Sequence, residues 1–242
     1  MVLRGTNDYR IERWFASGIP LVSVRLAGAV GPLPAVVIFH RFSGKKTDDI
    51  LHLALPLADS GCVAVLPDAA LHGDRAPHDF DLRLEHNRDS LFMDVLKGTV
   101  RESSEVLDWL AEREEIDAAR IGMVGTSMGG AVALAVACHK HTPAPKVAVA
   151  LMPTTSGPGS SIRQEAAYTP EAEQCFPTAL MIIHGTEDHI TPYPNARSFY
   201  DSLVPRYSAA PERLRFVDMP SEDHRVGAYC IEETLSWLER FL

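Results

Sequence analysis

Ser127 is the residue whose surroundings most directly suggest covalent chemistry. It lies at the centre of Gly125-Thr-Ser-Met-Gly129, a Gly-x-Ser-x-Gly pattern. The apolar run Ile121 to Val124 precedes this pattern, and the alanine-rich run Ala131 to Cys138 follows it. A serine on a sharp turn between a strand and a helix exposes its hydroxyl, and the flanking glycines permit close backbone packing. The pattern alone also fits a glycine-rich turn with a solvated serine, so the interpretation of Ser127 as a nucleophile requires a matching acid and base.

Two later segments supply that acid and base. A serine hydroxyl needs a base to remove its proton, and the base needs a third group to orient it. Asp188 follows the apolar run Ala179 to Ile183, and His224 follows the run Leu214 to Val217. Parallel strands bring their carboxyl ends to one edge of a sheet, where α/β proteins bind ligands. The sequence therefore predicts Asp188 and His224 as partners of Ser127, in the chain order of the α/β-hydrolase arrangement.

Other titratable residues compete for these roles. Glu187 and Asp223 are alternative acids, but the spacing to Pro192 favours Asp188. The rival bases are His40, His72, His184 and His189. A further group of polar residues has an irregular spacing that matches no zinc site, and we expect neither a metal nor a cofactor. That group consists of His78, Asp79, Asp81 and His86.

Composition excludes several classes of partner. The formal net charge of −9 argues against nucleic acid and anionic membranes, because both require a basic surface. The N-terminal residues mix charges throughout, and the longest apolar run, Ala131 to Cys138, is too short to span a bilayer. The four cysteines are widely spaced without a Cys-x-x-Cys motif, which favours buried free thiols. We expect a cytoplasmic protein with a small-molecule substrate; nothing in the sequence indicates its oligomeric state.

Apolar runs that alternate with amphipathic stretches predict the fold class. Several of the runs are apolar throughout, as expected for strands covered on both faces. This order predicts an α/β fold with a mostly parallel central sheet flanked by helices, in a single domain over residues 1–242. Two polar segments, residues 71–90 and 154–176, fall outside the alternation, and we expect them to form a small rim or cap. The predicted strands are 21–26, 35–39, 62–66, 121–124, 147–151, 179–183 and 214–217, and the predicted helices are 48–60, 91–114, 127–140, 195–203 and 226–242.

These features together resemble the α/β-hydrolase superfamily, in particular small bacterial carboxylesterases of its dienelactone-hydrolase and prolyl-oligopeptidase-like branch. The resemblance rests on the Gly125 to Gly129 pentapeptide, His184-Gly-Thr-Glu-Asp188 and two further segments. Those segments are Phe39-His-Arg-Phe-Ser-Gly-Lys-Lys46 and Pro67-Asp-Ala-Ala-Leu-His-Gly-Asp-Arg75. The resemblance implies an oxyanion hole formed by the backbone N–H groups of Met128 and Phe42.

Arg41 departs from the family pattern, because it stands where the family usually has glycine. If that glycine has a positive φ, an arginine there is strained or the loop is reshaped. A guanidinium beside the pocket would favour substrates that carry a carboxylate, and a solvent-facing arginine is the alternative. His40 is the second candidate for the substrate pocket, although its position in the motif is typical of a residue that organises the loop.

The sequence thus predicts a serine hydrolase that cleaves small carboxylic esters through an acyl-enzyme intermediate. A peptidase or an acyltransferase would use the same three residues. A non-catalytic binding protein on the same fold is the alternative of another class, since fold does not determine function.

Overall fold

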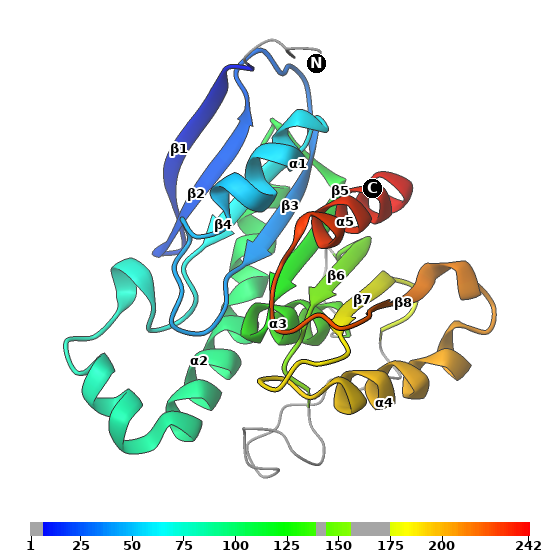
Figure 1. Ribbon diagram of the computed structural model, residues 1–242. Helices are drawn as coiled ribbons and strands as arrows, with labels where there is room; N and C mark the ends of the chain where they lie inside the picture. Colours follow the sequence, from blue (N-terminus) through cyan, green and yellow to red (C-terminus); the bar gives the residue numbers. More distant parts are fainter. Residues whose placement is uncertain (1–6, 139–143, 156–174) are drawn as a thin grey trace, which may run out of the picture.

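One sheet of eight strands organises the molecule, in the order β1-β2-β4-β3-β5-β6-β7-β8 (Figure 1). The computed structural model describes residues 7–138, 144–155 and 175–242. β1 and β2 are antiparallel to each other, β2 is antiparallel to β4, and the other pairs are parallel. The strands are β1 (Tyr9–Ala16), β2 (Ile19–Leu26), β3 (Leu33–Phe39), β4 (Val63–Pro67), β5 (Ile116–Thr126), β6 (Val147–Leu151), β7 (Ala179–Gly185) and β8 (Leu214–Met219).

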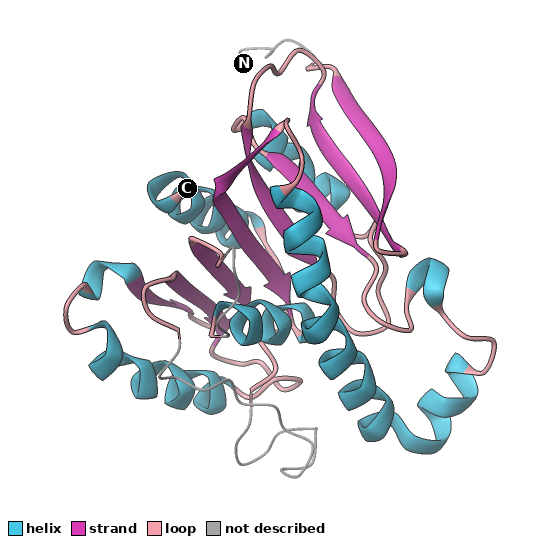
Figure 2. Ribbon diagram, turned by 180° about the vertical axis from the view of Figure 1, so that it is seen from behind, coloured by secondary structure: helices cyan, strands magenta, loops and turns pink. Residues whose placement is uncertain are grey.

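The helices form a layer on each face of this sheet (Figures 1 and 2). α1 and α5 pack on one face and α2, α3 and α4 on the other, so that the apolar core is divided into two clusters. The helices are α1 (Leu55–Asp59), which follows the π-helical turn η1 (Ile50–Ala54), α2 (Phe80–Ala111), α3 (Met128–Ala137), α4 (Tyr193–Leu203) and α5 (Ala228–Phe241). Three short 3₁₀ turns complete the described elements: η2 (Gly73–Arg75), η5 (Val204–Tyr207) and η6 (Pro211–Arg213).

The central strands are apolar because both of their faces are covered. Every residue of β6, Val-Ala-Val-Ala-Leu, is buried between the two helical layers. α3 is likewise buried along its whole length, which explains why its sequence is apolar on all sides. The fold predicted from the sequence is therefore confirmed, with each predicted strand and helix matched by an element of the structure.

Two elements differ from the sequence-based expectation: β1 was not predicted, and α2 begins earlier than residue 91. β1 is an edge strand that carries Arg10, Glu12 and Arg13, so it lacks the continuous apolar run used to find the others. α2 begins at Phe80 and bends at Asn87 (φ −154°, ψ 69°), so half of the proposed rim at 71–90 is helical. The second rim segment, 154–176, lies almost entirely outside the described residues. No helix among the described residues is long and apolar enough to cross a membrane.

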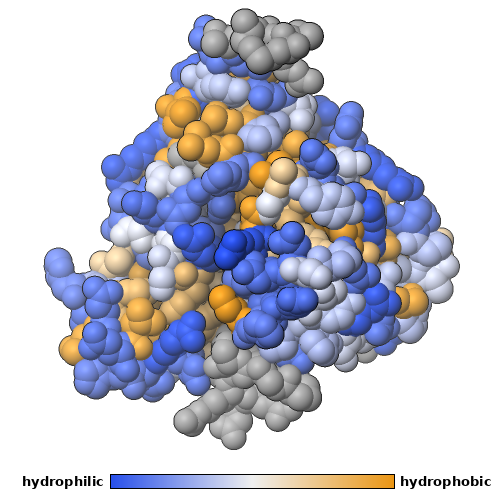
Figure 3. Space-filling model, viewed as in Figure 1, coloured by the Kyte–Doolittle hydropathy of each residue, from blue (hydrophilic) through white to orange (hydrophobic). Residues whose placement is uncertain are grey.

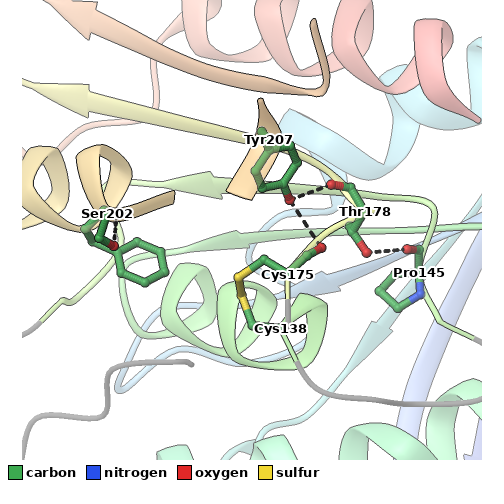
Figure 4. The surroundings of a disulfide bond; sticks show 7 residues. Cys138, Pro145, Cys175, Thr178, Ser202 and Tyr207 are labelled. Atoms are coloured by element: carbon green, nitrogen blue, oxygen red, sulfur yellow. Dashed lines mark hydrogen bonds between the residues drawn. A yellow bond between two sulfur atoms is a disulfide. The ribbon is translucent and has the colours of Figure 1, made fainter. Parts of the chain in front are cut away.

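The expectation of four free thiols is wrong for two of the cysteines. A disulfide joins Cys138, at the end of α3, to Cys175, before β7, as Figure 4 shows. The two cysteines are 37 residues apart in the sequence, and the fold brings them together. Cys62 and Cys230 are free and buried, as predicted. Disulfides persist mainly in oxidising compartments, so this bond does not favour the cytoplasmic location expected from the sequence.

Candidate active site

The turn between β5 and α3 holds Ser127 in a strained conformation. Its φ of 58° and ψ of −114° lie outside the regions that residues with a side chain normally adopt. Hydrogen bonds from the Ser127 N–H to the Leu151 carbonyl (2.8 Å) and from the Thr154 N–H to the Ser127 carbonyl (3.2 Å) hold the turn against β6. Such a sharp strand-to-helix turn presents a serine hydroxyl at the edge of the sheet.

The glycines on either side of Ser127 are required by backbone packing. A Cβ on Gly125 would lie 2.0 Å from the Gly129 carbonyl oxygen. A Cβ on Gly129 would lie 2.1 Å from the Phe39 carbonyl oxygen at the end of β3. Both distances are far below van der Waals contact, so the turn brings β5, α3 and β3 closer than any other residue type permits.

His224 and Asp188 meet at the same edge of the sheet. The His224 Nδ1 lies 2.6 Å from the Asp188 Oδ2, and the Asp188 side chain is fully buried. A carboxylate at this distance keeps the imidazole proton on Nδ1, which leaves Nε2 as a proton acceptor. The Ser127 hydroxyl has no hydrogen-bond partner within the described residues. Thr126, the neighbour of Ser127, lines the same cavity as His224.

Thr191 completes the surroundings of Asp188. Its hydroxyl donates to the Asp188 Oδ2 (2.8 Å) and lies 3.1 Å from the His224 Nδ1, and its N–H and that of Ile190 donate to the Asp188 Oδ1 (2.8 and 2.9 Å). Burial alone would raise the pKa of Asp188, but the hydrogen bonds with His224 and Thr191 outweigh it and lower the pKa to about 2. The carboxylate is therefore ionised at neutral pH.

The two N–H groups predicted for an oxyanion hole are both available. Met128 is the first residue of α3, so its N–H has no acceptor within the helix. No backbone or side-chain acceptor within the described residues takes the N–H of Met128 or of Phe42. The partial positive charge of a helix N-terminus also favours an anion beside Met128.

Buried histidines organise the loop that follows β3. The Ala69 N–H donates to the His40 Nε2 (3.0 Å), so the His40 Nδ1 carries the proton and donates to the Arg41 carbonyl (2.8 Å). The Ser43 N–H donates to the His72 Nε2 (2.9 Å), and the His72 Nδ1 donates to the Ala70 carbonyl (3.0 Å). Burial lowers the pKa of both rings and keeps them neutral. Because both nitrogens of His40 are bonded to backbone, its interactions are those of a loop organiser.

A buried ion cluster anchors the end of the same loop. The Lys46 Nζ lies 2.6 Å from Asp68 Oδ2 and 2.6 Å from Asp74 Oδ2, and the Asp68 side chain is fully buried. Burial disfavours the ammonium, but its hydrogen bonds to Asp68 and Asp74 raise the pKa of Lys46 above its usual value. The cluster ties the loops after β3 and β4 together through charge-assisted hydrogen bonds.

Arg41 is exposed and unstrained. The positive φ of this loop falls at Ser43 (61°) and not at Arg41, so the arginine requires no unusual backbone. Its guanidinium has no hydrogen bond or ion pair within the described residues, and it lines a cavity together with His224. The loop thus accommodates Arg41 because the side chain is exposed to solvent.

Phe42 turns to the opposite side and packs among aromatic rings. Its ring centroid lies 5.2 Å from that of Phe92, 5.3 Å from His72 and 6.3 Å from Phe80. We call Phe42, Phe80 and Phe92 the aromatic wall. It belongs to the face of the sheet covered by α2 and α3, whereas the cavity at Arg41 lies toward η1 and the loop before α5.

The structure separates the predicted acids and bases from their rivals. Glu187 is exposed, and Asp223 pairs with Arg225 (3.2 Å) at the surface. His184 is buried, with Nδ1 bonded to the Gly185 carbonyl (3.0 Å). Sequence reasoning missed Thr191, although its position between Asp188 and Pro192 was a signal that could have identified it.

The chain is similar to known proteins in sequence and in fold. A Bacillus subtilis (strain 168) protein named "Putative esterase YitV" is 29% identical over 96% of this chain and 99% of its own length. Esterase YjfP of Escherichia coli (strain K12) is 25% identical over 87% of this chain and 90% of its own length. The crystal structure of TT1662 from Thermus thermophilus has the same fold, with a TM-score of 0.75, 19% identity and coverage of 97% of this chain and 98% of that one.

The match to a protein family covers most of the chain. It extends over residues 22–208, from within β2 to the residue after η5, and includes Ser127 and Asp188. β1, the start of β2 and the C-terminal segment that carries His224 lie outside it. By this match the chain belongs to the Dienelactone hydrolase family.

Proposed function

We propose that this protein is a serine-dependent carboxylic ester hydrolase that acts on small esters. Membership of the family and the two esterase relatives support the hydrolysis of esters. The observation that carries the serine mechanism is the 2.6 Å contact between His224 Nδ1 and the ionised Asp188, at the sheet edge that also holds the strained Ser127.

In the proposed reaction the Ser127 Oγ attacks the ester carbonyl carbon while the His224 Nε2 takes its proton. The N–H groups of Met128 and Phe42 donate to the oxyanion of the tetrahedral intermediate. The carbon–oxygen bond to the alcohol then breaks, and the alcohol leaves with the proton from His224. A water attacks the acyl-enzyme in the same way, which releases the carboxylic acid and restores Ser127.

Asp188 acts through His224 in this scheme. It keeps the imidazole in the tautomer that has a free Nε2, and it stabilises the imidazolium that forms when His224 takes the proton. Thr191 is a positioning residue for Asp188, because its hydroxyl and its N–H both donate to that carboxylate.

Labelling with a fluorophosphonate probe, together with a p-nitrophenyl ester series, tests this function. Wild-type protein should be labelled and should hydrolyse short esters, and Ser127→Ala should lose both activities, with a fall in kcat of about 10⁵-fold or more. Ser104→Ala, an exchange of a serine on α2, is the matched control and should keep both. Absence of labelling in the wild type would favour a non-catalytic binding protein.

Two properties distinguish an esterase from a peptidase or an acyltransferase: the bond that is cleaved and the molecule that accepts the acyl group. Labelling combined with hydrolysis of amides and not of esters would favour a peptidase, and transfer to added alcohols in preference to water would favour an acyltransferase. Both outcomes would retain Ser127 and overturn the assignment of ester hydrolysis.

A further inference from the structure

A polar cavity lies beside the proposed catalytic histidine, on the side opposite the aromatic wall. Its volume of about 480 Å³ is in the range of small-molecule sites. It opens between the loop after β3 and the loop before α5. Its lining residues are Arg41, Asp48, Asp49, His52, Thr126, His224, Arg225 and Val226.

Several polar groups of this cavity lack partners within the described residues. The Thr126 hydroxyl is buried and has no hydrogen-bond partner. The guanidinium of Arg41 makes no hydrogen bond or ion pair. Burial, together with the neighbouring carboxylate of Asp48, raises the pKa of Asp49, although the positive charge of Arg41 and His52 opposes the shift. The Asp49 carboxyl group accepts no hydrogen bond from the residues that the structure describes. A buried polar group without a partner is costly, which applies to the Thr126 hydroxyl. The exposed Arg41 and the partly buried Asp49 carry charges that a ligand in the cavity can bond.

The charges of the cavity balance. Arg41 and Arg225 contribute two positive charges, and Asp48 and Asp49 contribute two negative charges. Asp48 and Asp49 would repel a ligand that carries a carboxylate, and Arg41 and Arg225 would repel a ligand that carries an ammonium group. Neutral hydroxyl groups both donate and accept, so they can bond to aspartate and arginine at once.

The surface of the molecule shows the same division. On the face seen in Figure 3, strongly hydrophilic residues gather at the centre, and a hydrophobic patch lies at the lower left over the first turns of α2. Phe80 packs against the apolar core from there, and Leu82 is exposed beside it.

We propose that this cavity binds the alcohol portion of the ester, and that this portion is a neutral polyhydroxylated group such as a sugar or another polyol. The proposal rests on the proposed ester hydrolysis and adds the substrate class to it. His224 lines the cavity and gives its proton to the leaving alcohol, so an alcohol bound there lies beside its proton donor.

Four acetate esters with matched leaving groups test the proposal. They are 6-O-acetylglucose, cyclohexylmethyl acetate, 4-(acetoxymethyl)cyclohexanecarboxylate and the corresponding ammonium ester. All four give the same acetyl-enzyme, so differences in kcat/KM arise from binding and acylation. The glucose ester should be preferred over the cyclohexylmethyl ester by about tenfold or more, since two or three hydrogen bonds to neutral groups are gained.

Variants of the cavity should reduce this preference. Arg41→Met and Asp49→Leu each remove hydrogen-bonding capacity, and each should lower the ratio of kcat/KM between the glucose and cyclohexylmethyl esters several-fold. Arg101→Met and Asp108→Leu, at exposed positions on α2, are the matched controls and should leave the ratio unchanged. Because the readout is a ratio within each variant, a general loss of activity does not imitate the effect.

The outcomes separate this proposal from the proposed function. Equal rates for the glucose and cyclohexylmethyl esters would overturn the polyol assignment, and so would a preference for either charged ester. Labelling of Ser127 by a fluorophosphonate in the same preparation would show that ester hydrolysis stands although the substrate class is wrong. Absence of labelling would contradict both the proposed ester hydrolysis and the proposed polyol substrate.

Discussion

The turn at Ser127 and the loop after β3 form two walls of one site, but they are held in different ways. The turn is fixed by backbone contacts so close that a Cβ at Gly129 would lie 2.1 Å from the Phe39 carbonyl oxygen. The loop is held by the side chains of His40, His72 and Lys46, which bond to backbone or to buried carboxylates. The first wall therefore admits no side chain at its two glycines, whereas the second accepts an arginine at position 41.

The largest expected effect comes from breaking the turn. In Gly129→Ala the new Cβ would force α3 away from β3, so we expect a loss of more than about 10²-fold in kcat/KM and a destabilisation of about 3 kcal/mol or more. Gly28→Ala is the control, because a Cβ there meets no atom. Ester hydrolysis and urea unfolding of both variants measure the difference, and a fully active Gly129→Ala would refute the packing argument.

The second prediction breaks the anchor of the loop. Lys46→Met removes the ammonium and leaves Asp68 buried without its charge partner, which should cost about 3–5 kcal/mol of unfolding free energy. Lys45→Met changes the exposed neighbour and should cost less than about 0.5 kcal/mol. Equal unfolding free energies for the two variants would show that the cluster does not hold the loop.

The loop after β7, which carries Asp188 and Thr191, resembles the loop after β3 in that side-chain hydrogen bonds hold it in place. Thr191→Val removes the hydroxyl that donates to Asp188, and we expect kcat to fall about tenfold with little change in KM. Thr191→Ser restores the hydroxyl and should recover most of the activity. If the serine variant were as slow as the valine variant, packing of the Thr191 methyl group would explain the loss instead.

Acid should weaken the loop and spare the turn, whose five residues carry no titratable side chain. Burial lowers the pKa of His40 and His72 below the unfolded value near 6.5. Below about pH 6.5 the unfolded chain therefore binds more protons at these two histidines than the folded chain does. The stability they contribute is complete above about pH 6.5 and declines below it. Asp188, with a pKa of about 2, loses its contribution only below about pH 4.

Urea unfolding between pH 7.5 and pH 5 measures this dependence. His72→Gln should show a smaller loss of stability over that range than the wild type does, and His78→Gln, at an exposed position, should behave like the wild type. A variant slope equal to that of the wild type would contradict the assignment to His72.

The smallest effect on stability is expected at Arg41. Its side chain is exposed and without a partner in the described part of the chain, and its backbone is unstrained. Arg41→Ala should therefore change the unfolding free energy by less than about 0.5 kcal/mol. A large loss would mean that the arginine supports the loop as the histidines do.

The elements predicted well from the sequence are those whose own residue pattern indicates which of their faces are covered. β6 is apolar on both faces and was located at its observed bounds, because a short, continuously apolar run is typical of a strand covered on both faces. β1 was missed because an edge strand alternates charged with apolar residues, and the early start of α2 was missed because its first turns are polar. The Cys138–Cys175 bond was missed because it depends on where the chain returns after β6.

The same distinction separates the residues of the candidate site that were predicted from the sequence from those that were not. Ser127, Asp188 and His224 were proposed from motifs and from their places after strands, which the parallel sheet brings to one edge. The Lys46–Asp68 pair was not found, because it joins two separate loops. Thr191 was missed although it lies only three residues after Asp188, in the same loop. The positive φ at Ser43 could not be assigned either, since no glycine marks it.

The most direct test of the account is to map the residue modified by diisopropyl fluorophosphate. After complete inactivation, tandem mass spectrometry of the digested protein should find one phosphoryl group, on the peptide that contains Ser127. His224→Ala should slow the modification by about 10³-fold or more, because Ser127 would lose its base. Modification of a different serine with loss of activity, or full activity with Ser127 modified, would contradict the account.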